Sequence, residues 1–173
     1  MTNGNSLLLV IVTGLPGTGK TTFARALAQK IEGLHLNTDI IRDELGLRGQ
    51  YDEESKQKVY RAMEVRAAAA LADGHPVAVD GTFYRKELRE PYQKLGARAG
   101  VRVYWLLIEA PEDVVRQRVS QKRDYSEADY AAYLRVRDAW EPFDIPHLTL
   151  PTGPLESMLD KALEYLHFKN NSS

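Results

Sequence analysis

Cysteine is absent from the 173 residues of the sequence. This excludes disulfide bonds, thiolate metal sites and cysteine nucleophiles. An excess of one charge is also missing, because 23 Lys and Arg face 24 Asp and Glu and give a formal net charge of -1. Such a balance argues against a protein built chiefly to coat nucleic acid, although it allows a local basic patch.

Long apolar runs are missing as well. The run from Leu7 to Val12 has six residues, whereas about 20 are needed to span a bilayer. Met1 to Ser6 contain no Lys or Arg, so a secretory signal is not expected. With 43% apolar and 27% charged residues, the composition is that of a soluble globule. We therefore expect a single cytoplasmic domain over residues 1–173 that does not bind membranes, and the oligomeric state stays open.

Short β-type runs alternate with helical stretches, a pattern typical of a parallel sheet covered by helices on both faces. The first run, residues 7–13, is apolar at consecutive positions and is expected to be the central strand. Further strands are predicted at 34–37, 76–80, 101–108 and 148–150. Helices are predicted at 20–32, 52–73 and 154–168, the second of them capped by Asp52.

A glycine-rich loop between the first strand and the first helix matches the pattern G-x-x-x-x-G-K-[ST]. Glycines let backbone N–H groups point at a phosphate, and the helix that follows adds the positive end of its dipole. Lys20 supplies a mobile charge for the β- and γ-phosphates, and the Thr21 hydroxyl can ligate Mg²⁺. The residues that we assign to ATP binding are Gly14, Leu15, Pro16, Gly17, Thr18, Gly19, Lys20, Thr21 and Thr22.

Proteins with this phosphate-binding loop, or P-loop, include GTPases, motor ATPases and kinases. The sequence lacks features of the first two classes. The sequence has no Asn-Lys-x-Asp motif for reading guanine, so a GTPase is disfavoured. The third strand ends in Asp80-Gly81 without the following Glu that motor ATPases use to activate water. Too few residues follow the last strand for the helical lid domain of those motors. A compact phosphotransferase remains.

An aspartate and an arginine follow the second strand, in the run Asn37-Thr38-Asp39-Ile40-Ile41-Arg42. Because the carboxyl ends of strands converge on the ligand crevice of a doubly wound sheet, Asp39 is expected near the γ-phosphate, where it can accept the proton of an attacking hydroxyl. Arg42 shares a helix face with Asp39, and its guanidinium can hold an anionic acceptor. In the alternative, Asp39 only caps a helix from Ile40 to Leu45 and Arg42 is solvated.

Asp80 and Thr82 follow the third strand and are further candidates for acceptor binding. Asp80 alternatively reaches the metal through a water molecule, or it is a turn residue. Three aromatic residues either stack on a ring of the acceptor or fill the core: Tyr51, Phe83 and Tyr84.

The C-terminal half of the chain carries a basic cluster: Arg116, Arg118, Lys122 and Arg123. Arginines that a mobile lid brings over the triphosphate stabilise the charge on the transferring phosphoryl group. We expect Arg118 or Arg123 to have this role, in a lid at residues 116–130. The alternative is a solvated basic helix balanced by Glu112 and Asp113.

Together these motifs resemble the small P-loop kinases of the AAA_33 type, relatives of polynucleotide 5′-hydroxyl kinases and zeta toxins. The resemblance rests on the runs GLPGTGKTTFARALA, NTDIIRDEL, VAVDGTF and RVSQKRDYSEA. It implies a three-layer α/β P-loop NTPase fold, with a five-stranded parallel sheet in the order 2-3-1-4-5, helices on both faces and a small lid. It further implies that Asp39 is the general base, that Arg42 contacts the acceptor, and that Arg118 or Arg123 grips the ATP phosphates.

The expected function is transfer of the γ-phosphate of ATP, with Mg²⁺, to a hydroxyl of a small molecule or of a short nucleic-acid end. Lys20, Asp39 and a lid arginine are the expected catalytic residues. The acceptor stays open, because neither the third-strand acceptor motif of adenylylsulfate kinases nor the Gly-rich loop of shikimate kinases is present. The alternatives are a nucleotide-sugar kinase similar to zeta toxins and an ATP-binding sensor with little chemistry.

Overall fold

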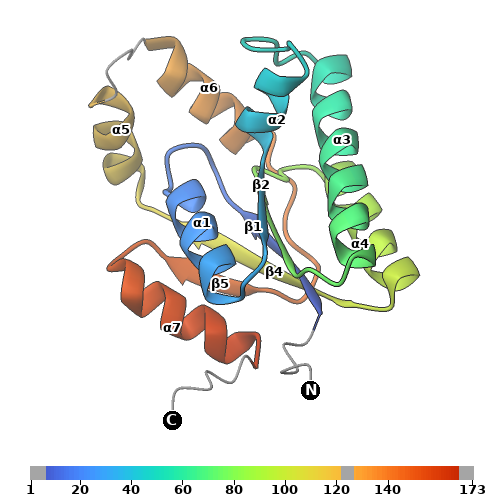
Figure 1. The fold of residues 1–173 in the computed structure, drawn as a ribbon. Coiled ribbons are helices and arrows are strands. Elements are labelled where there is room, and N and C mark those ends of the chain that lie inside the picture. The colour runs from blue at the N-terminus through green and yellow to red at the C-terminus, as the bar shows by residue number, and fades with distance from the viewer. Residues whose placement is uncertain (1–6, 122–126, 168–173) are drawn as a thin grey trace.

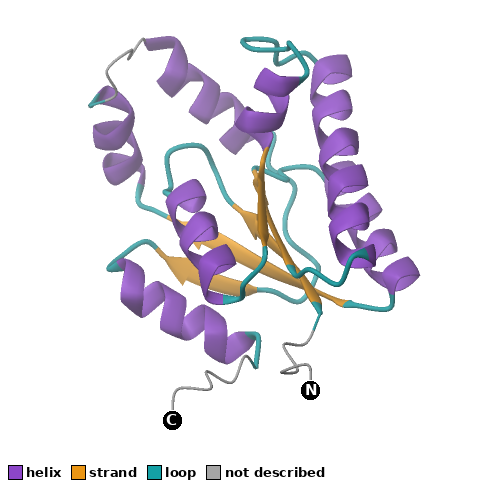
Figure 2. Ribbon diagram, in the orientation of Figure 1, coloured by secondary structure: helices purple, strands orange, loops and turns teal. Residues whose placement is uncertain are grey.

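The computed structural model describes residues 7–121 and 127–167, the second range with side chains from Tyr130 onward. Its centre is a five-stranded parallel sheet in the order β2-β3-β1-β4-β5, as predicted (Figure 2). β1 (Leu8–Thr13) is the middle strand, and all six of its residues are buried. The other strands are β2 (Leu34–Asn37), β3 (Val77–Gly81), β4 (Arg102–Glu109) and β5 (Leu148–Pro151).

Helices cover the two faces of the sheet in separate pairs (Figure 1). Side chains alternate along β1, so Leu8 and Val10 belong to one core and Leu9 and Ile11 to the other. The first core is covered by α1 (Lys20–Lys30) and α7 (Leu155–Tyr165), and the second by α3 (Glu53–Ala72) and α4 (Lys86–Ala99).

Three further helices lie beyond the carboxyl ends of the strands, on either side of the loop that joins β1 to α1 (Figure 1). They are α2 (Thr38–Glu44), α5 (Glu112–Ser120) and α6 (Glu127–Asp138). In the described ranges, none of the helices combines the length and the apolar character needed to cross a membrane.

Local signals in the sequence account for the ends of the predicted helices. α3 starts after Asp52, whose carboxylate accepts a hydrogen bond from the Ser55 backbone N–H at 3.2 Å, as predicted. α1 ends at Lys30 rather than at Glu32. Glu32 takes a left-handed φ of 54°, and the Gly33 N–H donates to the Ala28 carbonyl at 2.8 Å, which closes the helix.

α4 is a helix that the sequence-based prediction did not contain. It holds Pro91 in its interior, and a proline there removes one backbone hydrogen bond and usually ends a helix. Leu88, Tyr92 and Leu95 nevertheless recur at helical spacing, and all three are buried against the sheet. Packing of this apolar face outweighs the unfavourable proline.

A buried arginine on α4 ties the loop after β3 to the segment after α6. Arg89 is 1% exposed, and its guanidinium lies 4.0 Å from the centroid of the Phe143 ring. It donates to the backbone carbonyls of Phe83, Tyr84, Glu141 and Pro142 over distances of 2.6 to 3.3 Å. Burial lowers the pKa of Arg89, and these carbonyls compensate for the lost hydration. The loop that carries Thr82 is thereby fixed to the chain that leaves α6.

Candidate active site

The loop between β1 and α1 has the backbone conformation that close approach to a phosphate requires. Gly17 and Gly19 have φ angles of 80° and 90°, in the left-handed region that glycine adopts without strain. A Cβ atom on Gly14 would lie 2.6 Å from the Ile108 carbonyl oxygen, so a side chain does not fit there. The first turn of α1 carries no acidic residue, which leaves the positive end of the helix available to an anion.

The first turn of α1 carries Lys20, Thr21 and Thr22. The Lys20 ammonium donates to the Leu15 carbonyl at 3.3 Å, so it folds back against the loop. The buried Thr18 hydroxyl donates to the same carbonyl at 2.9 Å. Thr22 is exposed, and Pro16 is half-buried at the turn of the loop. The phosphate-binding motif therefore forms one continuous structure from Gly14 to Thr22.

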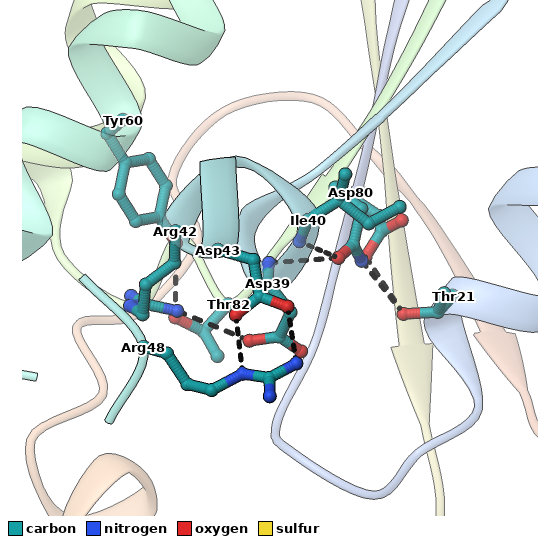
Figure 3. A network of polar contacts seen from close by, with 10 residues as sticks. Thr21, Asp39, Ile40, Arg42, Asp43, Arg48, Tyr60, Asp80 and Thr82 are labelled. Atoms are coloured by element: carbon teal, nitrogen blue, oxygen red, sulfur yellow. Dashed lines mark hydrogen bonds and ion pairs between the residues drawn. The ribbon is translucent and has the colours of Figure 1, made fainter. Parts of the chain in front are cut away.

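The Thr21 hydroxyl belongs to a polar network that joins α1, β2 and β3 (Figure 3). It donates to Asp80 Oδ1 at 3.1 Å and accepts from Asn37 Nδ2 at 3.1 Å. Asn37 Nδ2 also donates to Asp80 Oδ1 at 2.7 Å, and His35 Nε2 hydrogen-bonds to Asp80 Oδ2. Asp80 is 1% exposed, so side chains rather than water surround its carboxylate.

These oxygen atoms fit a magnesium ion. Mg²⁺ prefers hard oxygen ligands and is usually held by one or two protein groups together with waters and substrate phosphates. Thr21 stands directly after the phosphate loop with the Asp80 carboxylate behind it. A cation at the Thr21 hydroxyl would gain from the negative charge of Asp80 at short range. The contact with Thr21 favours a role of Asp80 at the metal over a role at the acceptor.

Asp39 and Arg42 lie one turn apart on α2. The N-cap of this helix is Asn37, whose Oδ1 accepts hydrogen bonds from the backbone N–H groups of Asp39 and Ile40 at 2.9 and 3.1 Å. The alternative in which Asp39 caps the helix is therefore wrong. The Asp39 side chain is 77% exposed, and its Oδ1 accepts from Arg42 Nη1 at 3.2 Å.

Arg42 is not the solvated residue of the alternative interpretation, because its side chain is only 7% exposed. Its guanidinium lies 4.5 Å from the ring centroid of Tyr51, a residue that is itself 62% exposed. Arg42 Nε is buried and has no hydrogen-bond partner among the described residues. Buried donors are rarely left unpaired. Phe83 and Tyr84, in contrast, fill the core.

Thr82 lies on the same side of Asp39 as Arg42, away from Thr21 and Asp80 (Figure 3). Its hydroxyl is 3.3 Å from the hydroxyl of Tyr60 on α3, which also accepts from the Phe83 backbone N–H at 3.2 Å. Burial raises the pKa of Tyr60, so the hydroxyl stays protonated. The structure thus separates a phosphate side around Thr21 from a second side around Arg42.

The basic cluster divides between α5 and residues outside the described ranges. A Cβ atom on Gly19 would lie 3.2 Å from Arg118 Nη1, so this guanidinium stands beside the phosphate loop. Arg118 Nη2 donates to the Thr152 hydroxyl at 3.2 Å. Arg116 lies 5.2 Å from the ring centroid of Tyr130. Lys122 lies outside the described residues, and so does Arg123, which is the second candidate for the lid arginine.

Sequence reasoning missed three residues of the site: His35, Asn37 and Tyr60. His35 and Asn37 occupy alternate positions of β2 and so share one face of the sheet. Asn directly before an Asp-containing helical turn is a favoured N-cap, which was the available signal for Asn37. Tyr60 carries no such local signal, because its partners are 22 and 23 residues away.

The phosphate loop and the strand order define a P-loop NTPase fold. The model of the AAA_33 family, described as an AAA domain, matches residues 9–143. The chain belongs to this family. The relation to polynucleotide kinases and zeta toxins stays a prediction.

Individual relatives include kinases and a protein without a described activity. The chain is 28% identical over 169 residues to an uncharacterized protein of Mycobacterium tuberculosis, a match that covers 89% of this chain and 34% of that protein. The chain therefore spans about a third of the length of this relative. An adenylyl-sulfate kinase of Chloroflexus aurantiacus is 29% identical over 170 residues, which are 92% of this chain and 86% of that kinase.

A solved structure shows the same fold. The APS kinase of Mycobacterium tuberculosis in complex with AMPPNP and APS is similar with a TM-score of 0.75 at 19% identity, over 93% of this chain and 98% of that one. The kinase among these relatives favours an enzyme over the sensor alternative.

The two buried arginines are expected to respond differently to replacement. Arg42→Met removes an unpartnered Nε and one bond to an exposed carboxylate, so we expect the free energy of unfolding to change by no more than about 1 kcal/mol. Arg89→Met leaves four carbonyls without their donor and is expected to cost about 3–5 kcal/mol. Urea unfolding of both variants measures the difference. Equal losses would contradict the view that Arg42 is placed for a ligand.

Proposed function

We propose that the protein transfers the γ-phosphate of ATP to a hydroxyl of a small acceptor, or of a short nucleic-acid end, that carries an anionic group near this hydroxyl. The observation that supports this most directly is the position of the Asp39–Arg42 pair. Asn37 connects its helix to the Thr21 hydroxyl, donating to Thr21 and accepting from the Asp39 N–H. A carboxylate and a cation thus stand next to the phosphate site.

The phosphate side binds the triphosphate of ATP along the loop from Gly14 to Thr21. Mg²⁺ would be held by the Thr21 hydroxyl, which donates a hydrogen bond to Asp80, and the ion would neutralise charge on the phosphate oxygens. Lys20 and Arg118 add two positive charges beside the loop. They stabilise the charge that the transferring phosphoryl group spreads over its oxygens.

The chemical step is an in-line displacement. The acceptor oxygen attacks the γ-phosphorus, the bond between this phosphorus and the β,γ-bridging oxygen breaks, and ADP leaves. The proton of the acceptor hydroxyl passes to the carboxylate of Asp39. Closure of the lid predicted at residues 116–130 would exclude water and so limit hydrolysis of ATP.

The side of the site around Arg42 is where we expect the acceptor, and its charge favours an anionic one. Arg42 is buried, keeps one donor without a partner among the described residues, and is stacked on Tyr51. A planar guanidinium held in this way matches a carboxylate, phosphate or sulfate group through two parallel hydrogen bonds. Tyr51 offers an exposed ring beside it. A nucleotide sugar is one acceptor of this chemistry.

Replacing the proposed base should remove transfer and leave ATP binding intact. Asp39→Asn keeps the shape of the side chain but loses the proton acceptor, so we expect turnover to fall by about 10²- to 10⁴-fold. The control is Asp43→Asn, one turn further on α2, whose carboxylate pairs with Arg48 at 2.8 and 2.9 Å. Nucleotide affinity is measured by calorimetry for both. Transfer by Asp39→Asn at a near wild-type rate would refute the base.

The lid arginine is tested on α5. Arg118→Ala is expected to lower turnover by about 10³-fold, in line with arginine fingers, with little change in the KM of the acceptor. Arg116→Ala, two residues earlier on the same helix, is the matched control. Arg123→Ala is measured beside them, because the resemblance leaves either arginine possible. If Arg118→Ala behaves like Arg116→Ala, Arg118 is not the lid arginine.

The acceptor class is tested with γ-labelled ATP and a panel of nucleosides, sugars, nucleotide sugars, adenylyl sulfate and oligonucleotides with free 5′-hydroxyls. We expect transfer only to anionic members, and none by Asp39→Asn. Salt distinguishes the two sizes of acceptor: several phosphate contacts with a polynucleotide would weaken binding by about 10³-fold or more between roughly 50 and 200 mM salt, whereas a small acceptor changes far less. Efficient transfer to neutral sugars or nucleosides would contradict the role of Arg42.

A further inference from the structure

Two side chains of β2 contact Asp80, although the proposed chemistry gives neither of them a part. His35 and Asn37 are two residues apart on this edge strand, and Asn37 pairs in register with Asp80 of β3. Their side chains therefore emerge on the face that carries Thr21. His35 bonds to Asp80 Oδ2, and Asn37 bonds to Oδ1. Both oxygens of a buried carboxylate are thus occupied from one strand.

The bonds of the Thr21 hydroxyl determine what is left for a cation. A hydroxyl has one proton to donate and two lone pairs to accept with. Thr21 gives its proton to Asp80 and uses one lone pair for Asn37 Nδ2. One lone pair remains, and its direction is set by the other two bonds. Asp80 holds the direction of the proton only as long as its own carboxylate does not rotate.

We propose that His35 and Asn37 are positioning residues for the metal site: they fix the Asp80 carboxylate and thereby the orientation of the Thr21 hydroxyl that would ligate Mg²⁺. This inference rests on the proposed function, because it requires a cation at Thr21. His35 fixes the oxygen that points away from Thr21, and Asn37 fixes the oxygen that Thr21 shares. Neither residue touches the nucleotide or the acceptor in this role.

Asn37 also links the proposed metal site to α2. The other end of its amide, Oδ1, caps α2 and holds the backbone at Asp39. The same side chain therefore sets the position of Thr21 relative to the helix that carries the proposed base. A shift of the Asp80 carboxylate would be passed to both.

The test compares the affinity for AMPPNP with Mg²⁺ and in EDTA, measured by calorimetry on the whole chain. His35→Ala removes the donor to Oδ2, and Asn37→Ser removes the Nδ2 donor but keeps an oxygen that caps the helix. Loss of such outer partners typically weakens metal binding about 10- to 100-fold. We expect the advantage that Mg²⁺ gives to nucleotide affinity to shrink by about that factor in both variants. Affinity in EDTA should change far less, because neither substitution replaces a residue of the phosphate loop.

Two further variants act as controls. His35→Gln offers a side-chain N–H again and should recover part of the effect, whereas His75→Ala, an exposed histidine after α3, should change nothing. If Asn37→Ser does not fold, as judged by thermal unfolding, the comparison of His35→Ala with His35→Gln decides. An unchanged Mg²⁺ advantage, or equal losses with and without Mg²⁺, overturns the inference. If wild type itself shows no Mg²⁺ advantage, the metal site of the proposed function fails first.

Discussion

The buried carboxylate of Asp80 fixes where the parts of the site stand relative to one another. A carboxylate removed from water is stable only when donors replace its hydration, and here they come from Thr21 of α1 and from His35 and Asn37 of β2. Because Asn37 also caps α2, the bonds that satisfy Asp80 anchor the helix of the proposed base. The Asp80 carboxylate and Asn37 thus connect the phosphate loop at Thr21 with the helix that carries Asp39.

Two buried arginines show how the fold and the site use the same side chain differently. Each guanidinium nitrogen of Arg89 donates to a backbone carbonyl, so this side chain stabilises the loop after β3. Arg42 is nearly as buried, but one of its donors lacks a partner in the described part of the chain. The proposed function gives this side chain a role in binding the acceptor.

Several elements followed directly from the sequence. The six buried residues of β1 form an apolar run, the glycines and Lys20 form a recognisable spacing, and Asp52 stands where a cap belongs. Helix α4 was not predicted, because Pro91 disfavours a helix in the local sequence. Packing of its apolar face against the sheet outweighs this preference. The strand order came from the family resemblance, since spacing along a chain does not reveal which strands become neighbours.

What the sequence determined by itself is the phosphate loop, the α/β alternation and the presence of an acid and an arginine after the second strand. These features are short-range, and the chemistry of a few adjacent residues encodes them. Only the tertiary structure decided that Asp80 is hydrogen-bonded to Thr21, that Arg42 is buried against Tyr51, and that His35 and Asn37 contact the same carboxylate. Such contacts depend on the register of parallel strands and on the packing of helices, which bring together residues far apart in the chain.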